Sequence, residues 1–271
     1  MRINRRQEVR QQNRVGVRRG PPLGRHFAAV VVTLLLMLLV WRVPGERGGD
    51  EKFDLWNKVL ADTSLILLCL ILMLGPVARF VPRMRRLVPW GRELGIGMFV
   101  TAGLHVVILF DGIRDLVRVS FGGDGFFGDE SFWAAANWVG LVALAYALVL
   151  AATSNDFAQR RLGRGWKFLQ RQAYTLFVLA WLHTAGWLLF SFPHSPTFIP
   201  WFWAFTMVAV VAQFAGFVHT VRSPRGPSPQ RAPAKTRAID STAAAVVVTK
   251  RAAIVALWGG FIVGVYLLGL N

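Results

Sequence analysis

The chain has 271 residues, of which 54% are hydrophobic and 17% are charged, and its mean hydropathy is +0.45. This composition excludes an ordinary soluble domain, which has fewer apolar and more charged residues. The formal net charge of +17 does not indicate a nucleic-acid-binding protein, because Lys and Arg lie mainly in short stretches between long apolar runs. That distribution is typical of membrane proteins, whose basic connections contact lipid headgroups.

Seven apolar runs are long enough to cross the hydrocarbon core of a bilayer. They are continuous rather than alternating, so they predict transmembrane helices and not the strands of a barrel. We therefore predict an all-α integral membrane protein, with a six-helix core and a seventh, C-terminal transmembrane helix. In chain order the runs cover residues 26–43, 60–80, 94–111, 132–152, 172–192, 199–220 and 252–270.

The connections between these runs alternate in charge. Residues 1–25 contain eight Arg, and the connections 79–93 and 154–171 are also basic, whereas 44–62 and 112–131 lean acidic. By the positive-inside rule, the N-terminus lies in the cytoplasm and the C-terminus lies outside.

Charge and composition also predict the division of the chain. Residues 1–25 form a basic cytoplasmic leader that we expect to be disordered, and residues 26–220 form the six-span membrane domain. Residues 221–251 are rich in Pro and basic residues, which predicts a disordered cytoplasmic linker. Residues 252–271 are then the seventh transmembrane helix.

Two of the predicted helices carry a histidine near the middle of an apolar run. His105 lies eleven residues after Leu94, and His183 lies eleven residues after Gln172. Both helices enter from the cytoplasmic side, and at about 1.5 Å per residue both imidazoles lie about 16 Å into the membrane. An ionisable residue at this depth indicates a functional site. We therefore expect two nitrogen ligands at matching heights.

The residues stacked around these histidines are mostly small, which permits either close helix packing or a flat macrocycle between the helices. Haem iron readily binds two axial imidazoles. Zinc would need further ligands, and no Cys, Asp or Glu lies at this level. The alternative is a cofactor-free membrane protein, such as a transporter or an assembly factor. Its histidines would then form interhelical hydrogen bonds or relay protons.

Two stretches resemble a known family. "GPVARFVPRMRRLVPWGRELGIGMFVTAGLHVVILF" (75–110) has an apolar helix end with Pro-x-x-Arg, an Arg-Arg pair and a Gly-containing helix with a histidine. "ATSNDFAQRRLGRGWKFLQRQAYTLFVLAWLHTAGWLL" (152–189) is the next matching block, with a Thr-Ser helix end, "RRLGRGW" and a helix with its own histidine. Over roughly residues 60–220 the chain is similar to the ferric reductase-like transmembrane domain family. Within that family it most resembles the haem-binding membrane subunits of the bacterial protein-methionine-sulfoxide reductase system.

The resemblance implies that His105 and His183 are the axial ligands of a haem b. The family carries another histidine thirteen residues before the one that matches His183, but this chain has Gln170 there. The position thirteen residues before His105 is Arg92. A second haem is therefore not expected, unless His219 at the cytoplasmic end of the sixth run replaces the missing ligand. Two further candidates, Arg114 and Arg118 on the outer side, either pair with haem propionates or face solvent and lipid headgroups.

The predicted function is a b-type cytochrome of a bacterial inner or plasma membrane, which passes electrons to an acceptor or reductase partner on the outer side. FMN or a quinone, or a cytoplasmic reductase, would connect the haem to its electron source. No soluble flavin or nicotinamide domain follows the seventh run, so we expect an electron-transfer subunit rather than a complete enzyme.

Overall fold

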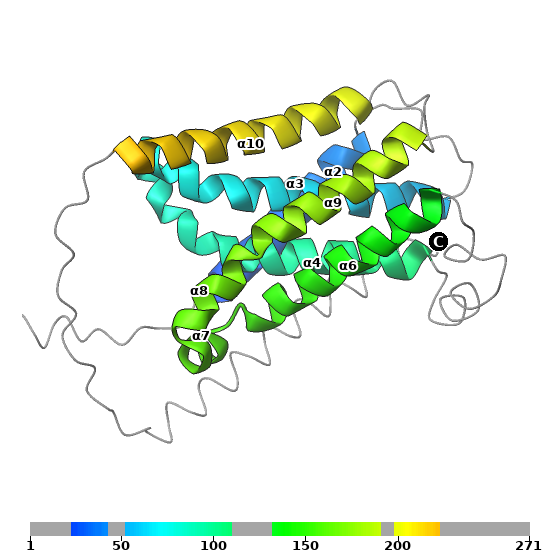
Figure 1. Ribbon diagram of the computed structural model, residues 1–271. Helices are drawn as coiled ribbons and strands as arrows, with labels where there is room; N and C mark the ends of the chain where they lie inside the picture. The colour runs from blue at the N-terminus through cyan, green and yellow to red at the C-terminus, as the bar shows by residue number, and fades with distance from the viewer. Residues whose placement is uncertain (1–22, 43–51, 110–131, 191–197, 223–271) are drawn as a thin grey trace, which may run out of the picture.

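The computed structural model describes residues 23–42, 52–109, 132–190 and 198–222. Within these ranges all regular structure is helical (Figure 1). The long helices are α2 (Leu23–Arg42), α3 (Lys52–Phe80), α4 (Gly91–Leu109), α6 (Phe132–Thr153), α9 (Ala173–Phe190) and α10 (Phe198–Arg222). The short ones are the 3₁₀ turns η1 (Pro82–Arg86) and η2 (Val88–Trp90) and the helices α7 (Asp156–Leu162) and α8 (Arg164–Arg171).

The long helices form a bundle of the kind predicted from the apolar runs. Five of them are long and apolar enough to cross a membrane, within the described residues: Leu23–Arg42, Leu55–Phe80, Pro82–Ile108, Ala135–Thr153 and Pro200–Arg222. The apolar helix α9 adds 18 residues to the bundle. The predicted seventh span (252–270) and nearly all of the predicted linker lie outside the described residues.

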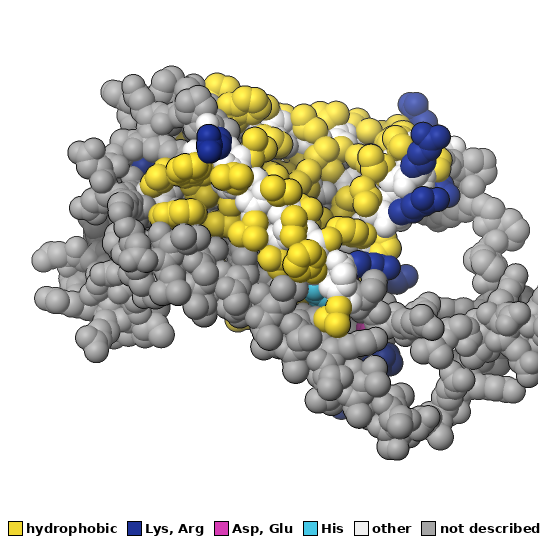
Figure 2. Space-filling view, turned by 180° about the vertical axis from the view of Figure 1, so that it is seen from behind, with side chains coloured by type: hydrophobic (Ala, Val, Ile, Leu, Met, Phe, Trp, Pro, Cys, Tyr) yellow, Lys and Arg dark blue, Asp and Glu magenta, His cyan; other side chains and the backbone are white. Residues whose placement is uncertain are grey.

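Large hydrophobic side chains cover the outside of this bundle. On α2 they include Leu35 and Leu39, which are 58% and 62% exposed, and on α10 they include Val211 and Phe214, at 64% and 67%. Figure 2 shows such side chains over much of one face, while most of the Lys and Arg on that face gather towards one end. Exposed apolar surface of this extent marks contact with lipid. The chain is thus built as an integral membrane protein.

We call the end that carries these cations the basic end. It is formed by the connection between α3 and α4, by α7 and α8, and by the last turn of α10 (Figure 1). Its exposed cations are Arg83, Arg85, Arg86, Arg160, Arg161, Arg164, Lys167, Arg171 and Arg222. The predicted basic connection 154–171 is therefore not a plain loop. It forms α7 and α8, which join at Gly163, where a φ of +52° suits a residue without a side chain.

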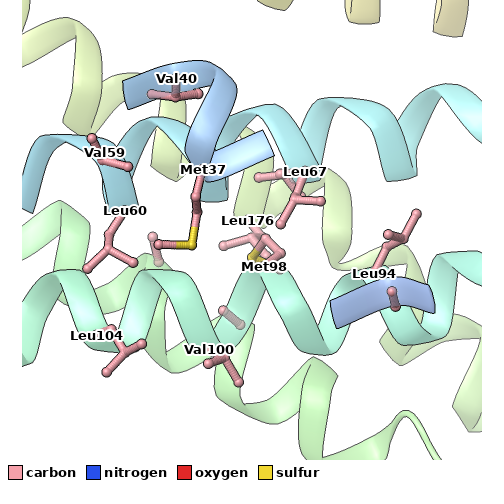
Figure 3. Packing of buried hydrophobic residues seen from close by; sticks show 14 of the residues in the cluster. Met37, Val40, Val59, Leu60, Leu67, Leu94, Met98, Val100, Leu104 and Leu176 are labelled. Atoms are coloured by element: carbon pink, nitrogen blue, oxygen red, sulfur yellow. The ribbon is translucent and has the colours of Figure 1, made fainter. Parts of the chain in front are cut away.

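The core lies where α3 and α4 pack against each other and against α2 (Figure 3). Leu60 and Leu67 of α3 are fully buried, and Met98 and Leu104 of α4 are nearly so. α3 begins at Lys52, eight residues before the predicted start at residue 60. The charged residues between these positions interrupt the apolar run but do not stop a helix. This extension matters because it carries Asn57, which contacts the candidate site.

Pro76 lies inside α3 and cannot donate the backbone hydrogen bond that the Leu72 carbonyl would receive in a regular helix. The side chain of Gln213 on α10 donates to this carbonyl instead. Gly216 packs directly on the proline ring, since a Cβ at Gly216 would lie 2.9 Å from the Pro76 Cβ. In a bilayer a backbone group freed by proline needs such a partner from a neighbouring helix. This contact fixes α10 on α3.

We expect Gln213→Leu to lower the free energy of unfolding in detergent by about 1 kcal/mol, because the Leu72 carbonyl loses its donor. Pro76→Ala restores the backbone N–H at position 76 as a donor to the same carbonyl. In the Pro76→Ala background, Gln213→Leu should therefore lower the free energy of unfolding by less than half as much. Equal losses in the two backgrounds, measured by thermal unfolding, would contradict this account.

Candidate functional site

The structure brings the rings of His105 and His183 together inside the bundle. His105 comes from α4 and His183 from α9, and their ring centroids are 6.4 Å apart with an angle of 66° between the ring planes. Both residues are half-buried. The structure therefore brings together two imidazoles that are 78 positions apart in the sequence.

Each imidazole is held by one backbone carbonyl of a neighbouring helix. The His105 Nδ1 lies 3.2 Å from the Asn57 oxygen on α3, and the His183 Nδ1 lies 2.8 Å from the Ala136 oxygen on α6. A carbonyl can only accept a hydrogen bond, so Nδ1 is the protonated nitrogen of each ring. In the neutral ring, Nε2 then carries the lone pair that can bind a metal ion.

The ring spacing suits one metal ion between two imidazoles. A metal–nitrogen bond to histidine is about 2.0 Å long and a ring nitrogen lies about 1.1 Å from the ring centre, so two imidazoles on opposite sides of one ion have centroids about 6.2 Å apart. In the described part of the chain no group of three or more His, Cys, Asp or Glu side chains is placed so that it could hold a metal ion. An ion that takes only two ligands from the protein, such as haem iron, therefore fits this pair better than zinc does.

The α6 helix forms a cradle for His183 that we did not predict. A Cβ at Gly140 would lie 2.7 Å from the His183 Nδ1 and 2.8 Å from its Cε1, so the ring occupies the space that any other residue would fill. The carbonyl that accepts from His183 belongs to Ala136, one turn earlier on α6. A single glycine in the apolar run "AAANWVGLVALAY" (134–146) is the signal that could have revealed this close approach.

Two further contacts hold α9 against α6. The Trp187 Nε1 donates to the Asn137 Oδ1 at 3.0 Å. A Cβ at Gly186 would lie 3.2 Å from the Ala136 Cβ. Gly186 is one of the small residues around His183, for which the sequence allowed either helix packing or space for a cofactor. The structure shows that it packs against α6.

The other candidates do not join the histidine pair. The ring of His219, at the end of α10, lies 5.1 Å from that of Phe80 at the end of α3, whereas Asn57 and the pair lie near the start of α3. Gln170 of α8 lies 3.4 Å from the Thr153 hydroxyl through its Nε2. Arg92 forms an ion pair of 2.8 Å with Asp156. The candidate propionate partners Arg114 and Arg118 lie outside the described residues.

Comparison with known proteins gives a consistent set of relatives. The family described as ferric reductase like transmembrane component matches residues 60–181, a range that includes His105 and ends two residues before His183. The protein-methionine-sulfoxide reductase heme-binding subunits MsrQ of Salmonella paratyphi B and Salmonella newport are each 32% identical over 154 residues. MsrQ of Salmonella arizonae is 30% identical over the same length. Each alignment covers 55% of this chain and 72% of the relative. No solved structure matches the chain.

We expect Gly140→Ala to lower the free energy of unfolding by about 1–3 kcal/mol, because the new methyl group overlaps the His183 ring and must displace it. Gly103→Ala, on α4 near His105, is the matched control, since the Cβ it would add points into open space. Thermal unfolding of the two variants in detergent measures the difference. Equal stabilities would show that the His183 ring does not depend on the space above Gly140.

Proposed function

We propose that this chain, which belongs to the ferric reductase-like transmembrane family, is the haem-binding electron-transfer subunit of a membrane oxidoreductase system. It binds one haem b between His105 and His183. The facing imidazoles, with Nδ1 on a carbonyl and Nε2 available, are the observation that carries the proposal. The relatives named as heme-binding subunits support it independently.

The haem supplies reversible one-electron transfer when it is bound at this site. The chain's own residues do the rest. The Asn57 and Ala136 carbonyls fix the tautomer and orientation of the two rings and make each Nε2 a better electron donor. Gly140 provides the space for His183. The apolar helices keep water away from the pair.

A single haem is favoured over two, because the two positions where the resemblance would put a second pair of ligands are engaged in other contacts. Arg92 is paired with Asp156, and Gln170 lies against Thr153. His219, the other candidate, lies against Phe80 at the end of α3. The electron donor then belongs to one of two chemical classes, flavins or quinols, and the acceptor is a redox partner on the outer side.

A cofactor-free protein is the second candidate, and one observation favours it. Each histidine already forms a hydrogen bond to a neighbouring helix, which would by itself account for a structural histidine. Such a role does not require the two rings to face each other at 6.4 Å, whereas ligation of one ion does.

The reduced-minus-oxidised absorption spectrum of the purified chain separates these functions. We expect a sharp b-type α band in the wild type, and its complete loss in His105→Ala and in His183→Ala, because each removes an axial ligand. His219→Ala is the matched control and should leave the band unchanged. A colourless wild-type protein, or a band that survives both substitutions, would exclude the haem assignment.

We also propose that the basic end faces the cytoplasm, on the strength of its Arg and Lys residues. Cys69 is fully buried, so a thiol reagent that does not cross membranes has little background reaction. We expect a cysteine at the exposed position Arg42, at the opposite end of α2, to react in intact cells. A cysteine at Arg161 should react only after the membrane is opened. The reverse pattern would invert the topology.

A further inference from the structure

Two ionisable side chains are enclosed near the basic end, outside the histidine pair. Glu93, in the first turn of α4, is 1% exposed, and neither of its carboxylate oxygens has a hydrogen-bond partner among the described residues. His26 of α2 is 3% exposed, and its Nδ1 likewise has no partner there. Neither residue takes part in the proposed ligation of haem.

The two residues belong to one cluster, where the start of α2 meets the start of α4. Figure 3 shows the first turns of α2 beside Leu94, the residue that follows Glu93. Glu93 interacts electrostatically with Arg25, Arg92 and Asp156, and His26 interacts with Arg92. Of these groups, Arg92 is committed to Asp156 on α7.

Enclosed polar atoms in folded proteins nearly always have a partner, and a carboxylate without one is strongly unfavourable. The cluster therefore needs a further group that can donate a hydrogen bond to Glu93 and also form a hydrogen bond with the His26 Nδ1. The charges already balance, because the guanidinium groups of Arg25 and Arg92 offset the carboxylates of Glu93 and Asp156. A metal cation is therefore not required, and protons with a few water molecules satisfy both groups.

We propose that Glu93 and His26 form a proton-binding site whose occupancy follows the redox state of the haem held by His105 and His183. This rests on the proposed function. When the haem gains one electron from a flavin or quinol donor, the Glu93 carboxylate gains one proton from water at the basic end. One O–H bond forms at Glu93 while one breaks in a hydronium ion of that water, and the flavin or quinol donor is oxidised by one electron. The proton offsets the charge of the electron.

The two sites are close enough for this coupling because they share one helix. Glu93 and His105 are twelve residues apart on α4, which corresponds to about 18 Å along a helix. At that distance, an effective dielectric constant of about 20 lets one unit of charge change the affinity for a proton by ~5-fold. By linkage, the proton changes the affinity of the haem for an electron by the same factor.

The experiment is a spectroelectrochemical titration of the purified full-length chain at a series of pH values. The midpoint potential of the wild type should fall as the pH rises, by the amount that corresponds to the ~5-fold coupling. Glu93→Gln, which keeps the shape but cannot release a proton, should give a potential that does not change with pH. His219→Gln, an exposed histidine at the same end, is the control and should keep the wild-type profile.

A second measurement keeps Glu93, in case Glu93→Gln does not assemble. The chain has five glutamates, so Glu8, Glu46, Glu51 and Glu130 are first replaced by Gln, which leaves Glu93 as the one that takes the label. With ¹³C-labelled glutamate, the reduced-minus-oxidised infrared spectrum should contain a protonated carboxyl band that moves with the label and in D₂O. A wild-type potential independent of pH, an unchanged profile in Glu93→Gln, or a spectrum without this band overturns the proton site. A chain without any α band overturns the proposed function as well.

Discussion

The site depends on how an imidazole satisfies its two nitrogens inside an apolar bundle. Water is scarce there, so every polar nitrogen needs a partner from the protein or from a ligand. In both histidines the protonated Nδ1 uses a backbone carbonyl, of Asn57 or of Ala136. Carbonyls cannot satisfy the second nitrogen, which has a lone pair and no hydrogen. Two such nitrogens on facing rings are best satisfied together by one electrophilic centre, and this is the physical basis of the proposed haem site.

The surrounding helices position each of the two imidazole rings in a different way. On the His105 side, α3 extends beyond its apolar run and thereby brings the Asn57 carbonyl to the ring. On the His183 side, α6 carries no side chain at Gly140, and the ring packs against the bare backbone. Both solutions use backbone groups, whose positions are set by whole helices rather than by flexible side chains. The geometry of the pair is therefore as rigid as the packing of α3, α4, α6 and α9.

The fold was predictable because apolar runs of membrane length leave few alternatives. The helix positions agree within a few residues for α2, α4, α6, α9 and α10. The start of α3 was misplaced because charges near a membrane surface interrupt the hydropathy signal without ending the helix. The helices α7 and α8 were missed for a related reason, since a stretch with five cations reads as a connection. Pairing of His105 with His183 was predictable from equal depths on two helices.

The partners of the two histidines were not predictable in the same way. A backbone carbonyl has no sequence signature, so only the fold can reveal that Asn57 and Ala136 accept hydrogen bonds. Glu93 was hidden by its neighbours, because an acid among Arg85, Arg86 and Arg92 looks like part of a solvated, charged connection. The opposite is found, since its side chain is enclosed while most of those cations remain exposed.

Glu93 and His105 lie at opposite ends of α4, so the two ends of this helix have different roles. One end of the helix presents the enclosed acid beside the cationic surface, and the other presents the ring proposed to bind the haem. Charge that arrives at the histidine pair is poorly screened, because the segment between them consists of apolar and small residues with no formal charge. An uncompensated electron there is costly in a medium of low dielectric constant. A nearby group that can take up a proton lowers that cost, and Glu93 is the enclosed carboxyl on the same rigid helix.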